Sequence, residues 1–147
     1  MADFEYDLNI ARPAAEVWDR LNDVPFTPRW EKGLTAISSS PDGPLAVGSR
    51  VTKVSKMPAG HLTIVQEVTA MDPAAMTRED TVEGGMMSGT VASWKLTAEG
   101  EGTALSCHVT VRAQGLASLG IPVLALGLKR QIGEELQAFK EVLEGAA

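Results

Sequence analysis

The fold is decided by a stretch near the C-terminus, GLASLGIPVLALGLKRQIGEELQAFKEVL, which covers Gly115–Leu143. Its apolar residues recur every three or four positions, and this spacing predicts one long helix with an apolar stripe. The stripe comprises Ile121, Leu124, Leu128, Ile132, Leu136, Phe139 and Leu143. Polar side chains occupy the back of the second half only. The first half, Ile121–Leu128, is apolar nearly all round, so we expect it to be buried.

The chain before this helix alternates between apolar runs and turn signals, which predicts a meander of strands. Strands are expected at Phe4–Ile10, Leu34–Ser40, Gly48–Met57, His61–Met71, Met76–Glu83, Met86–Thr97 and Thr103–Ala113. Two short helical segments, Pro13–Leu21 and Pro25–Pro28, follow the first strand. The turns are tight, as at a Gly84–Gly85 hairpin, so consecutive strands should pair antiparallel.

Together these elements predict an α+β fold in a single domain that covers residues 1–147. A curved antiparallel sheet of about seven strands would wrap around the C-terminal helix, and the two short helices after strand one would close an end of the groove. A helix of about 24 residues spans roughly 36 Å. It is therefore the one predicted element large enough to fill the concave face of such a sheet.

Composition narrows the class of protein. A net charge of −6, with 44% apolar and 22% charged residues, is typical of an ordinary globular protein. Lys and Arg do not cluster in the sequence, so nucleic acid binding is not expected and anionic membrane surfaces are disfavoured. Gly115–Leu128 is apolar but too short to span a bilayer, so we expect a buried helix and no stable membrane insertion.

Cysteine content and the N-terminus point to the cytoplasm. Cys107 is the single cysteine, which excludes an internal disulfide, and MADFEYDLNI lacks the features of a secretory signal. The sequence shows no metal-ligand spacing, no glycine-rich phosphate loop and no nucleophile elbow. We therefore expect no metal and no cofactor, and catalytic residues stay unknown at this stage.

Two stretches resemble a known superfamily. IARPAAEVWDRLNDVPFTPRW, from Ile10 to Trp30, carries a Val17–Trp18 pair after the first strand, and LKRQIGEELQAFKEVLEG closes the chain. With the order of elements above, these stretches resemble the START-like helix-grip proteins, or SRPBCC superfamily, with its bacterial polyketide cyclase/dehydrase branch as the best fit. The resemblance implies a helix-grip fold with a cavity between sheet and helix, which the superfamily uses for lipids, sterols, polyketides, hormones and aromatic compounds.

The predicted strand Met76–Glu83 is the most informative candidate for a site. If Met76 and Val82 mark its inward face, period-two alternation places Arg78 and Asp80 inward as well. Two charges in a core are costly unless they are paired or hydrogen-bonded. The resemblance implies a role for them, since cavities of this superfamily often place a polar or charged group there to orient a ligand's carboxylate, carbonyl or hydroxyl. The opposite parity, or an exposed edge strand, is the structural alternative.

Further candidates follow from the neighbouring strands and from the resemblance. Gln66 shares a face with Ile64 and suits a hydrogen bond either to a ligand or to the protein itself. Trp94 stands beside small residues and is either core or a ligand platform, and Trp30 would close one mouth of the cavity. Ile64, Gln66, Arg78 and Trp94 are expected to face Leu124 and Leu128 across the pocket. The predicted ligand-binding residues are Trp30, Ile64, Gln66, Arg78, Asp80, Trp94, Leu124 and Leu128.

Three hypotheses for function follow. The leading hypothesis is binding of a small hydrophobic molecule of the lipid, polyketide or aromatic type in the cavity. The second is an enzyme of the polyketide cyclase, aromatase or dehydratase type, in which Arg78 or Asp80 polarises a carbonyl or moves a proton. The third is a protein-interaction module, which would have an exposed apolar patch and a filled interior. The sequence leaves open whether the protein is an enzyme, and it is compatible with a homodimer.

Overall fold

The computed structural model describes residues 2–57 and 60–145, apart from the side chains at positions 57, 116–118 and 124. This part of the chain forms the strands β1 (Ala2–Ile10), β2 (Leu34–Ser40), β3 (Arg50–Met57), β4 (Gly60–Asp72), β5 (Thr77–Glu83), β6 (Val91–Glu99) and β7 (Gly102–Val111). The helices are α1 (Ala14–Leu21) and α2 (Ile121–Gly145), with the 3-10 helices η1 (Val24–Arg29) and η2 (Gly115–Gly120).

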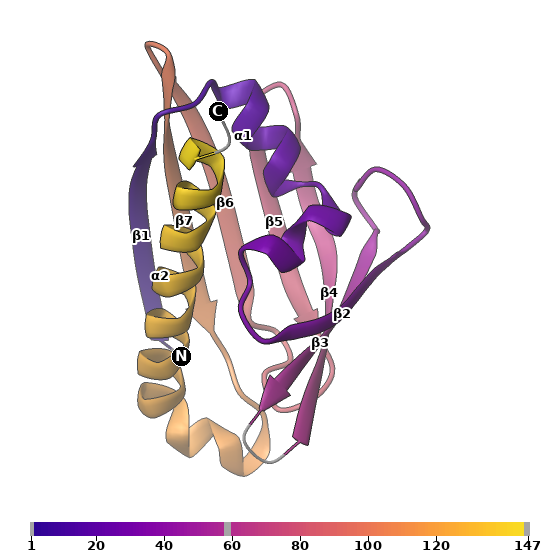
Figure 1. Cartoon of the computed structure of the whole chain (residues 1–147). Helices are drawn as coiled ribbons and strands as arrows, with labels where there is room; N and C mark the ends of the chain where they lie inside the picture. The colour runs from indigo at the N-terminus through magenta and orange to yellow at the C-terminus, as the bar shows by residue number, and fades with distance from the viewer. Residues whose placement is uncertain (1, 58–59, 146–147) are drawn as a thin grey trace.

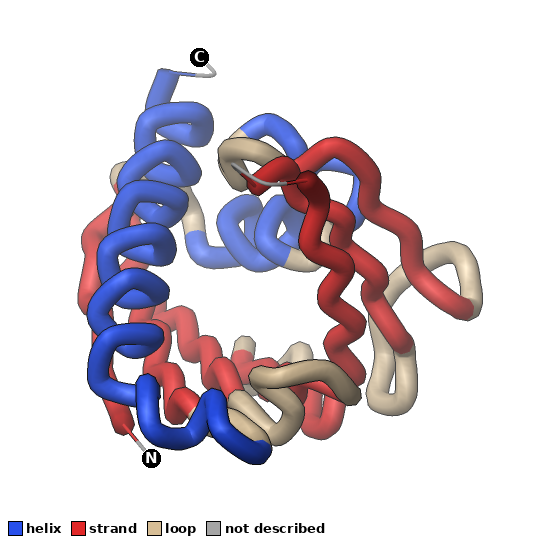
Figure 2. The backbone as a smooth tube through the Cα atoms, turned by 90° about the horizontal axis from the view of Figure 1, so that it is seen from below, coloured by secondary structure: helices blue, strands red, loops and turns tan. Residues whose placement is uncertain are grey.

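The strands form one antiparallel sheet with the order β1-β7-β6-β5-β4-β3-β2. The sheet curves around α2, which packs over β1 and β7, while α1 lies over β6 and β7 (Figure 1). Seen along its length, the backbone closes into a ring of strands and helices (Figure 2). The predicted helix-grip fold is confirmed.

The half of the interior between α2 and the strands β1 and β7 is filled. Alternate residues of the paired strands face α2, as in the pairs Phe4–Val109 and Leu8–Leu105. The side chains with almost no exposure include Ile10, Val17, Leu105, Val109, Val111, Leu136, Phe139 and Leu143. The end of α2 is also tied to the start of the chain, because Arg12 Nε donates to the Leu143 carbonyl at 2.9 Å.

One turn differs from its prediction. Gly84–Gly85 is not a two-residue hairpin, because β6 begins at Val91 rather than at Met86. The strands instead close through backbone hydrogen bonds between Val82 and the pair Gly89 and Thr90. Gly84, Gly85 and Gly89 all have positive φ, which suits glycine and bends the chain into a longer loop.

The first half of the predicted helix also differs. Residues Gly115–Gly120 are 3-10 rather than α-helical, and the expectation that Ile121–Leu128 is buried all round is wrong. Val123 and Leu126 are 76% and 71% exposed, while Ile121 on the opposite face is buried. The physical reason is that the sheet covers only one face of α2, and no other described segment packs on the opposite face of these turns.

Candidate functional site

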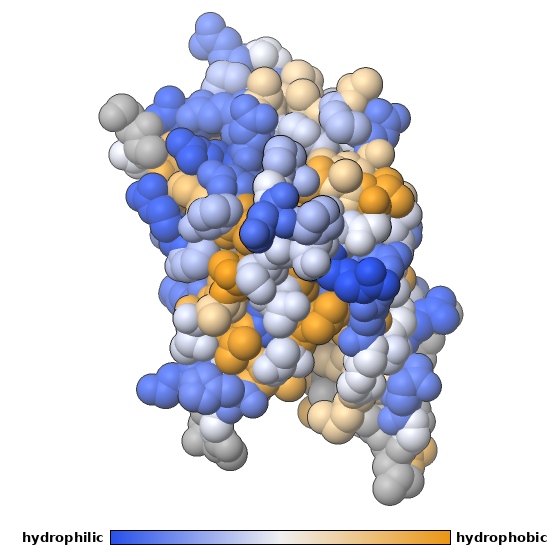
Figure 3. All heavy atoms as spheres, turned by 90° about the vertical axis from the view of Figure 1, so that its right-hand side faces the viewer, coloured by the Kyte–Doolittle hydropathy of each residue, from blue (hydrophilic) through white to orange (hydrophobic). Residues whose placement is uncertain are grey.

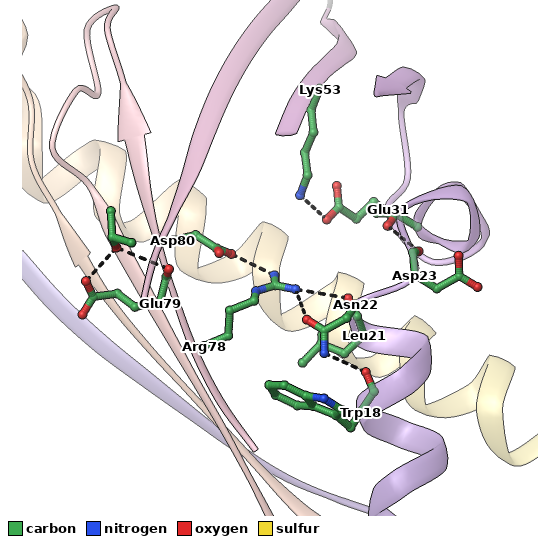
Figure 4. A network of polar contacts seen from close by, with 11 residues as sticks. Trp18, Leu21, Asn22, Asp23, Glu31, Lys53, Arg78, Glu79 and Asp80 are labelled. Atoms are coloured by element: carbon green, nitrogen blue, oxygen red, sulfur yellow. Dashed lines mark hydrogen bonds and ion pairs between the residues drawn. The ribbon is translucent and has the colours of Figure 1, made fainter. Parts of the chain in front are cut away.

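The structure confirms the inward parity of β5. Asp80 pairs in register with the buried Val68 of β4 and with Ala92 of β6, so its side chain faces the interior. Arg78 and Asp80 form an ion pair of 2.8 Å between Nη2 and Oδ2, with side chains only 11% and 8% exposed. Glu79, between them, points to the outer face, where its carboxylate accepts a hydrogen bond from Thr69 (Figure 4).

Arg78 is held by groups from α1, from the residue that follows α1, and from β6. Its Nη1 donates to Asn22 Oδ1 at 2.7 Å and, at 3.4 Å, to the carbonyl of Leu21 at the end of α1 (Figure 4). Its guanidinium carbon lies 5.8 Å from the ring centroid of Trp94 on β6, within cation–π range. These contacts fix the guanidinium in one orientation above β5.

A second ion pair lies on the same inner side. Lys53 Nζ of β3 contacts Glu31 Oε1, just beyond η1, at 2.6 Å, and both side chains are mostly buried (Figure 4). Sequence reasoning missed this pair. Lys53 shares a face with the buried Val51, but Val54 makes the opposite face equally apolar, so the alternation in β3 carries no parity signal.

The two ion pairs border one cavity of about 50 Å³. It is lined by Leu21, Val24, Thr27, Trp30, Glu31, Ile37, Leu45, Val51, Lys53, Gln66, Arg78, Asp80 and Trp94. Five of the predicted site residues are therefore brought together: Trp30, Gln66, Arg78, Asp80 and Trp94. This volume holds a ligand's polar group or a few waters rather than a whole polyketide.

Two of the remaining predicted residues, Ile64 and Leu128, are not among the described residues that line this cavity. Ile64 lies on the inner face of β4, opposite Lys53, and is half-buried. Leu128 packs against the buried core from α2, on the β1 and β7 side of the interior. The side chain of Leu124 lies outside the described residues. Leu128 lies apart from the cavity because α2 packs on β1 and β7 rather than above β4.

Several side chains that line the cavity keep polar atoms without partners. Among the described residues, Trp30 Nε1, Trp94 Nε1, Arg78 Nε and Asp80 Oδ1 are buried and make no hydrogen bond. An unsatisfied buried polar group costs about 1–3 kcal/mol. These four atoms, three donors and one acceptor, belong to side chains that line one cavity.

The interior above β3, β4 and β5 is less filled than the half under α2. Inward residues of this half, such as Ile64, Gln66 and Val82, are only half-buried although their side chains face the concave side. From the side of β2 to β4, hydrophobic side chains are visible between polar ones in the middle of the molecule (Figure 3). Apolar surface on the inner side of this half therefore still reaches solvent.

Glu135 of α2 adds an unusual carboxyl group. Its pKa is raised to about 7, mainly by burial and then by the nearby charge of Glu31, while a hydrogen bond from Gln131 and the charge of Lys53 act in the opposite direction. The only sequence signal for this residue is its place beside the apolar stripe, next to Leu136. A carboxyl group with a pKa near neutrality can donate or accept a proton at physiological pH.

Cys107 of β7 lies in the filled half of the interior and is fully buried. Burial raises the pKa of its thiol to about 12, with a smaller contribution from the charge of Asp80. Such a thiol is a packing group rather than a nucleophile. In the part of the chain that the structure describes, no group of three or more His, Cys, Asp or Glu residues is placed to hold a metal ion.

Comparison with known proteins identifies the family. The family model described as polyketide cyclase/dehydrase and lipid transport matches residues 1–144. The chain belongs to this family. No match to a curated protein was found. Across residues 2–57 and 60–145, no helix of this polyketide cyclase/dehydrase-like protein is long and apolar enough to cross a membrane.

Solved structures of other proteins share this fold. The aromatase/cyclase Zhui from Streptomyces sp. R1128 superposes with a TM-score of 0.81 at 15% identity, covering 97% of this chain and 93% of that one. The di-domain aromatase/cyclase BexL gives 0.81 at 18% identity, covering 98% of this chain and 47% of BexL. A START superfamily protein from Mycobacterium smegmatis gives 0.70 at 15% identity, covering 97% and 94%.

Proposed function

We propose that this protein binds a small, mostly apolar molecule whose oxygen-bearing group enters the cavity between Arg78, Asp80 and Trp94. The observation that carries the proposal is the set of buried polar atoms without partners, among the described residues, around that cavity. Indole N–H groups and the Arg78 Nε would donate to a ligand carbonyl or hydroxyl oxygen, and Asp80 Oδ1 would accept from a ligand hydroxyl. Membership in a family described by polyketide and lipid ligands supports the apolar class of ligand.

The cavity size constrains how such a ligand would lie. About 50 Å³ accommodates the polar group, so the apolar remainder would extend along the half-buried inner side of β4 and β5, past Gln66 and Val82. Burial of roughly 200–300 Å² of ligand apolar surface gives a gross 5–8 kcal/mol before the entropic cost of binding. Micromolar affinity is the expected result.

Two measurements test the proposal. Native mass spectrometry of protein purified without denaturation, followed by extraction, would identify a co-purified ligand. Titration with hydroxylated aromatic compounds and fatty acids would then be followed through Trp fluorescence, since Trp30 and Trp94 both line the cavity. Saturable quenching supports the proposal, and the absence of binding across both classes of compound would contradict it.

A variant of the inner ion pair tests the role of Arg78 in binding, and a variant of an outer arginine serves as its control. Arg78→Gln combined with Asp80→Asn removes both inner charges without leaving one of them unpaired, and it should weaken binding at least about tenfold because a charge-assisted hydrogen bond is lost. Arg50→Gln removes an arginine that pairs with Glu67 and Glu83 on the exposed side of the sheet, and it should leave binding unchanged. Equal effects of the two changes would argue against a ligand at Arg78.

Glu135 supports a second candidate function, a polyketide cyclase-type or dehydratase-type reaction in the same interior. A carboxyl group with a pKa of about 7 suits general acid–base catalysis, and Lys53 and Glu31 lie near enough to affect its charge. The test is turnover of a poly-ketone substrate by the wild-type chain and by Glu135→Gln. Conversion that falls at least about a hundredfold in Glu135→Gln supports this candidate, whereas binding without conversion supports a carrier.

A further inference from the structure

Three aliphatic side chains at the start of α2 face solvent together. Leu119 of η2 and Val123 and Leu126 of α2 are 82%, 76% and 71% exposed. They are spaced four and three residues apart, which places Val123 and Leu126 on one helical face, opposite Ile121 and Leu128. A single exposed leucine is ordinary. Three exposed aliphatic side chains in one short segment are typical of a surface that binds a membrane or another protein.

Two basic residues, Lys129 and Arg130, follow this face along α2, ahead of the first acidic residue of the helix, Glu134. From residue 102 to residue 133 the chain contains Arg112, Lys129 and Arg130 and no Asp or Glu, a formal charge of +3 in a protein of net charge −6. Lys129 and Arg130 follow Leu126 by one turn and are exposed. Among the residues that the structure describes, Arg130 pairs only with Glu134, through a long and exposed contact of 3.6 Å, so its charge is little neutralised.

The end of β3 and the start of β4, on either side of their connecting turn, lie at the same end of the molecule as η2 and the start of α2 (Figure 1). The strand residues around that turn include the exposed Lys56 and His61, and no acidic residue occurs from position 51 to position 66. Lys56 therefore adds a positive charge near this end of the molecule, across the ring seen in Figure 2 from α2. A partner of negative charge is favoured over a neutral one.

The chemistry of the face distinguishes between such partners. A symmetric contact with a second copy would place Lys129 and Arg130 of one chain against the same residues of the other, which like-charge repulsion opposes. Protein interfaces rely on Trp, Tyr and Arg anchors, whereas the exposed apolar residues here are Leu and Val on a convex helix end. Aliphatic side chains followed by Lys and Arg on a helix surface match a helix that lies at the interface of an anionic bilayer.

The net charge of −6 disfavours anionic surfaces for the molecule as a whole, but the local charge differs. We propose that the α2 docking face, defined as Leu119, Val123, Leu126, Lys129 and Arg130, docks reversibly onto an anionic lipid bilayer. The three aliphatic side chains enter the boundary between headgroups and acyl chains, and the two cations lie among the lipid phosphates. Docking presents one end of the ring to the membrane, so an apolar ligand would pass between bilayer and interior without crossing water. The contact needs no ligand, and it therefore stands or falls separately from the proposed function.

The test is flotation of the full chain with lipid vesicles. We expect binding to vesicles of phosphatidylcholine mixed with phosphatidylglycerol, weaker binding to phosphatidylcholine alone, and a decrease as salt concentration rises. Leu119→Ser with Val123→Ser and Leu126→Ser should lower the vesicle partition coefficient at least about tenfold. Lys129→Gln with Arg130→Gln should reduce binding to anionic vesicles only.

Val47→Ser is the matched control, because Val47 is 63% exposed in the loop between β2 and β3, outside this face. It should leave vesicle binding unchanged, and circular dichroism should show every variant folded. Vesicle binding that is absent in the wild type, or unaffected by the triple variant, would overturn the proposal. Self-association that the triple variant abolishes, without vesicle binding, would assign the face to a second copy instead.

Discussion

Arg78 and Asp80 neutralise each other across the inner face of β5, with Nη2 and Oδ2 2.8 Å apart, yet each keeps one buried polar atom without a partner in the described part of the chain. Arg78 Nε and Asp80 Oδ1 are these atoms. An ion pair built only for stability would satisfy them, because a partly satisfied buried network is worse than an apolar core. The pair is therefore better suited to meeting a third polar group.

Removal of Arg78 alone should destabilise the protein more than removal of the pair. Arg78→Ala leaves Asp80 buried with an uncompensated charge, and we expect the free energy of unfolding to fall by about 3 kcal/mol or more. Arg78→Ala combined with Asp80→Ala should recover part of that loss. Urea denaturation of both single variants and the double variant measures the coupling, and strictly additive effects would show that the two charges do not interact.

Gly133 lets β1 approach α2, and replacing it should be costly. A Cβ atom at Gly133 would overlap the Tyr6 hydroxyl and would lie 2.8 Å from Tyr6 Cζ, while that hydroxyl donates to the Lys129 carbonyl at 2.6 Å. Gly133→Ala should lower the free energy of unfolding by about 1–3 kcal/mol through overpacking. Thermal denaturation in wild-type and Tyr6→Leu backgrounds measures the effect, which should be smaller without the tyrosine.

Gly127 is the matched control for that substitution, because a Cβ atom there meets no other group within 4 Å. Gly127→Ala should stabilise the helix by up to about 1 kcal/mol, since alanine has the higher helix propensity. Stabilisation by both substitutions would show that Tyr6 does not approach Gly133 in solution.

Stability should depend on pH through Glu135. Its pKa is raised from about 4.5 to about 7 in the folded protein, so between these values the folded state binds more protons than the unfolded state. Stability is then highest at low pH and is lost as pH rises from about 4.5 to 7, by up to about 3 kcal/mol. Glu135→Gln should abolish this loss and be more stable than wild type above pH 7.

Urea denaturation across that pH range measures the difference between wild type and Glu135→Gln. The neighbouring Glu134 is exposed, so Glu134→Gln should retain the wild-type pH dependence. A difference between wild type and Glu135→Gln that is constant from pH 4.5 to 8 would show that the carboxyl group is solvated rather than buried.

Cys107 should be unreactive in the folded protein. Its side chain is fully buried and burial raises the thiol pKa to about 12, so a thiol reagent at pH 8 meets neither an accessible nor an ionised group. Reaction with Ellman's reagent should be slower by orders of magnitude than in urea. In a Cys107→Ser background, His108→Cys faces the outer side of the sheet and should react rapidly. Fast labelling of native Cys107 would contradict a filled interior under α2.

Much of the architecture was predictable because it rests on local periodicity. The alternation in Phe4–Ile10 and the three-to-four spacing from Leu128 to Leu143 each specify one buried face, and both elements formed there. Positions at turns were less predictable. Gly84–Gly85 has the composition of a tight hairpin, but the pairing of Val82 with Thr90 decides where the strands close, and that pairing is a long-range choice.

The candidate site was predictable only where strand parity was visible. Arg78 and Asp80 followed from the alternation of β5, and the structure confirms that they face inward. Lys53, Glu31 and Glu135 were missed, because each comes from a different element and only folding brings them near one another. Their ligand and catalytic roles stay predictions for the experiments above.

The sequence by itself determined the class of fold, since amphipathic periods and turn residues act within a few positions of the chain. The tertiary structure alone decided which half of the interior is filled and which face of α2 is covered. One helix packed over β1 and β7 covers only part of a seven-stranded sheet and exposes its own far side. Because of that packing, a polar cavity remains beside Arg78, and Val123 and Leu126 are exposed. Burial of a residue depends on what packs against it rather than on its own hydrophobicity.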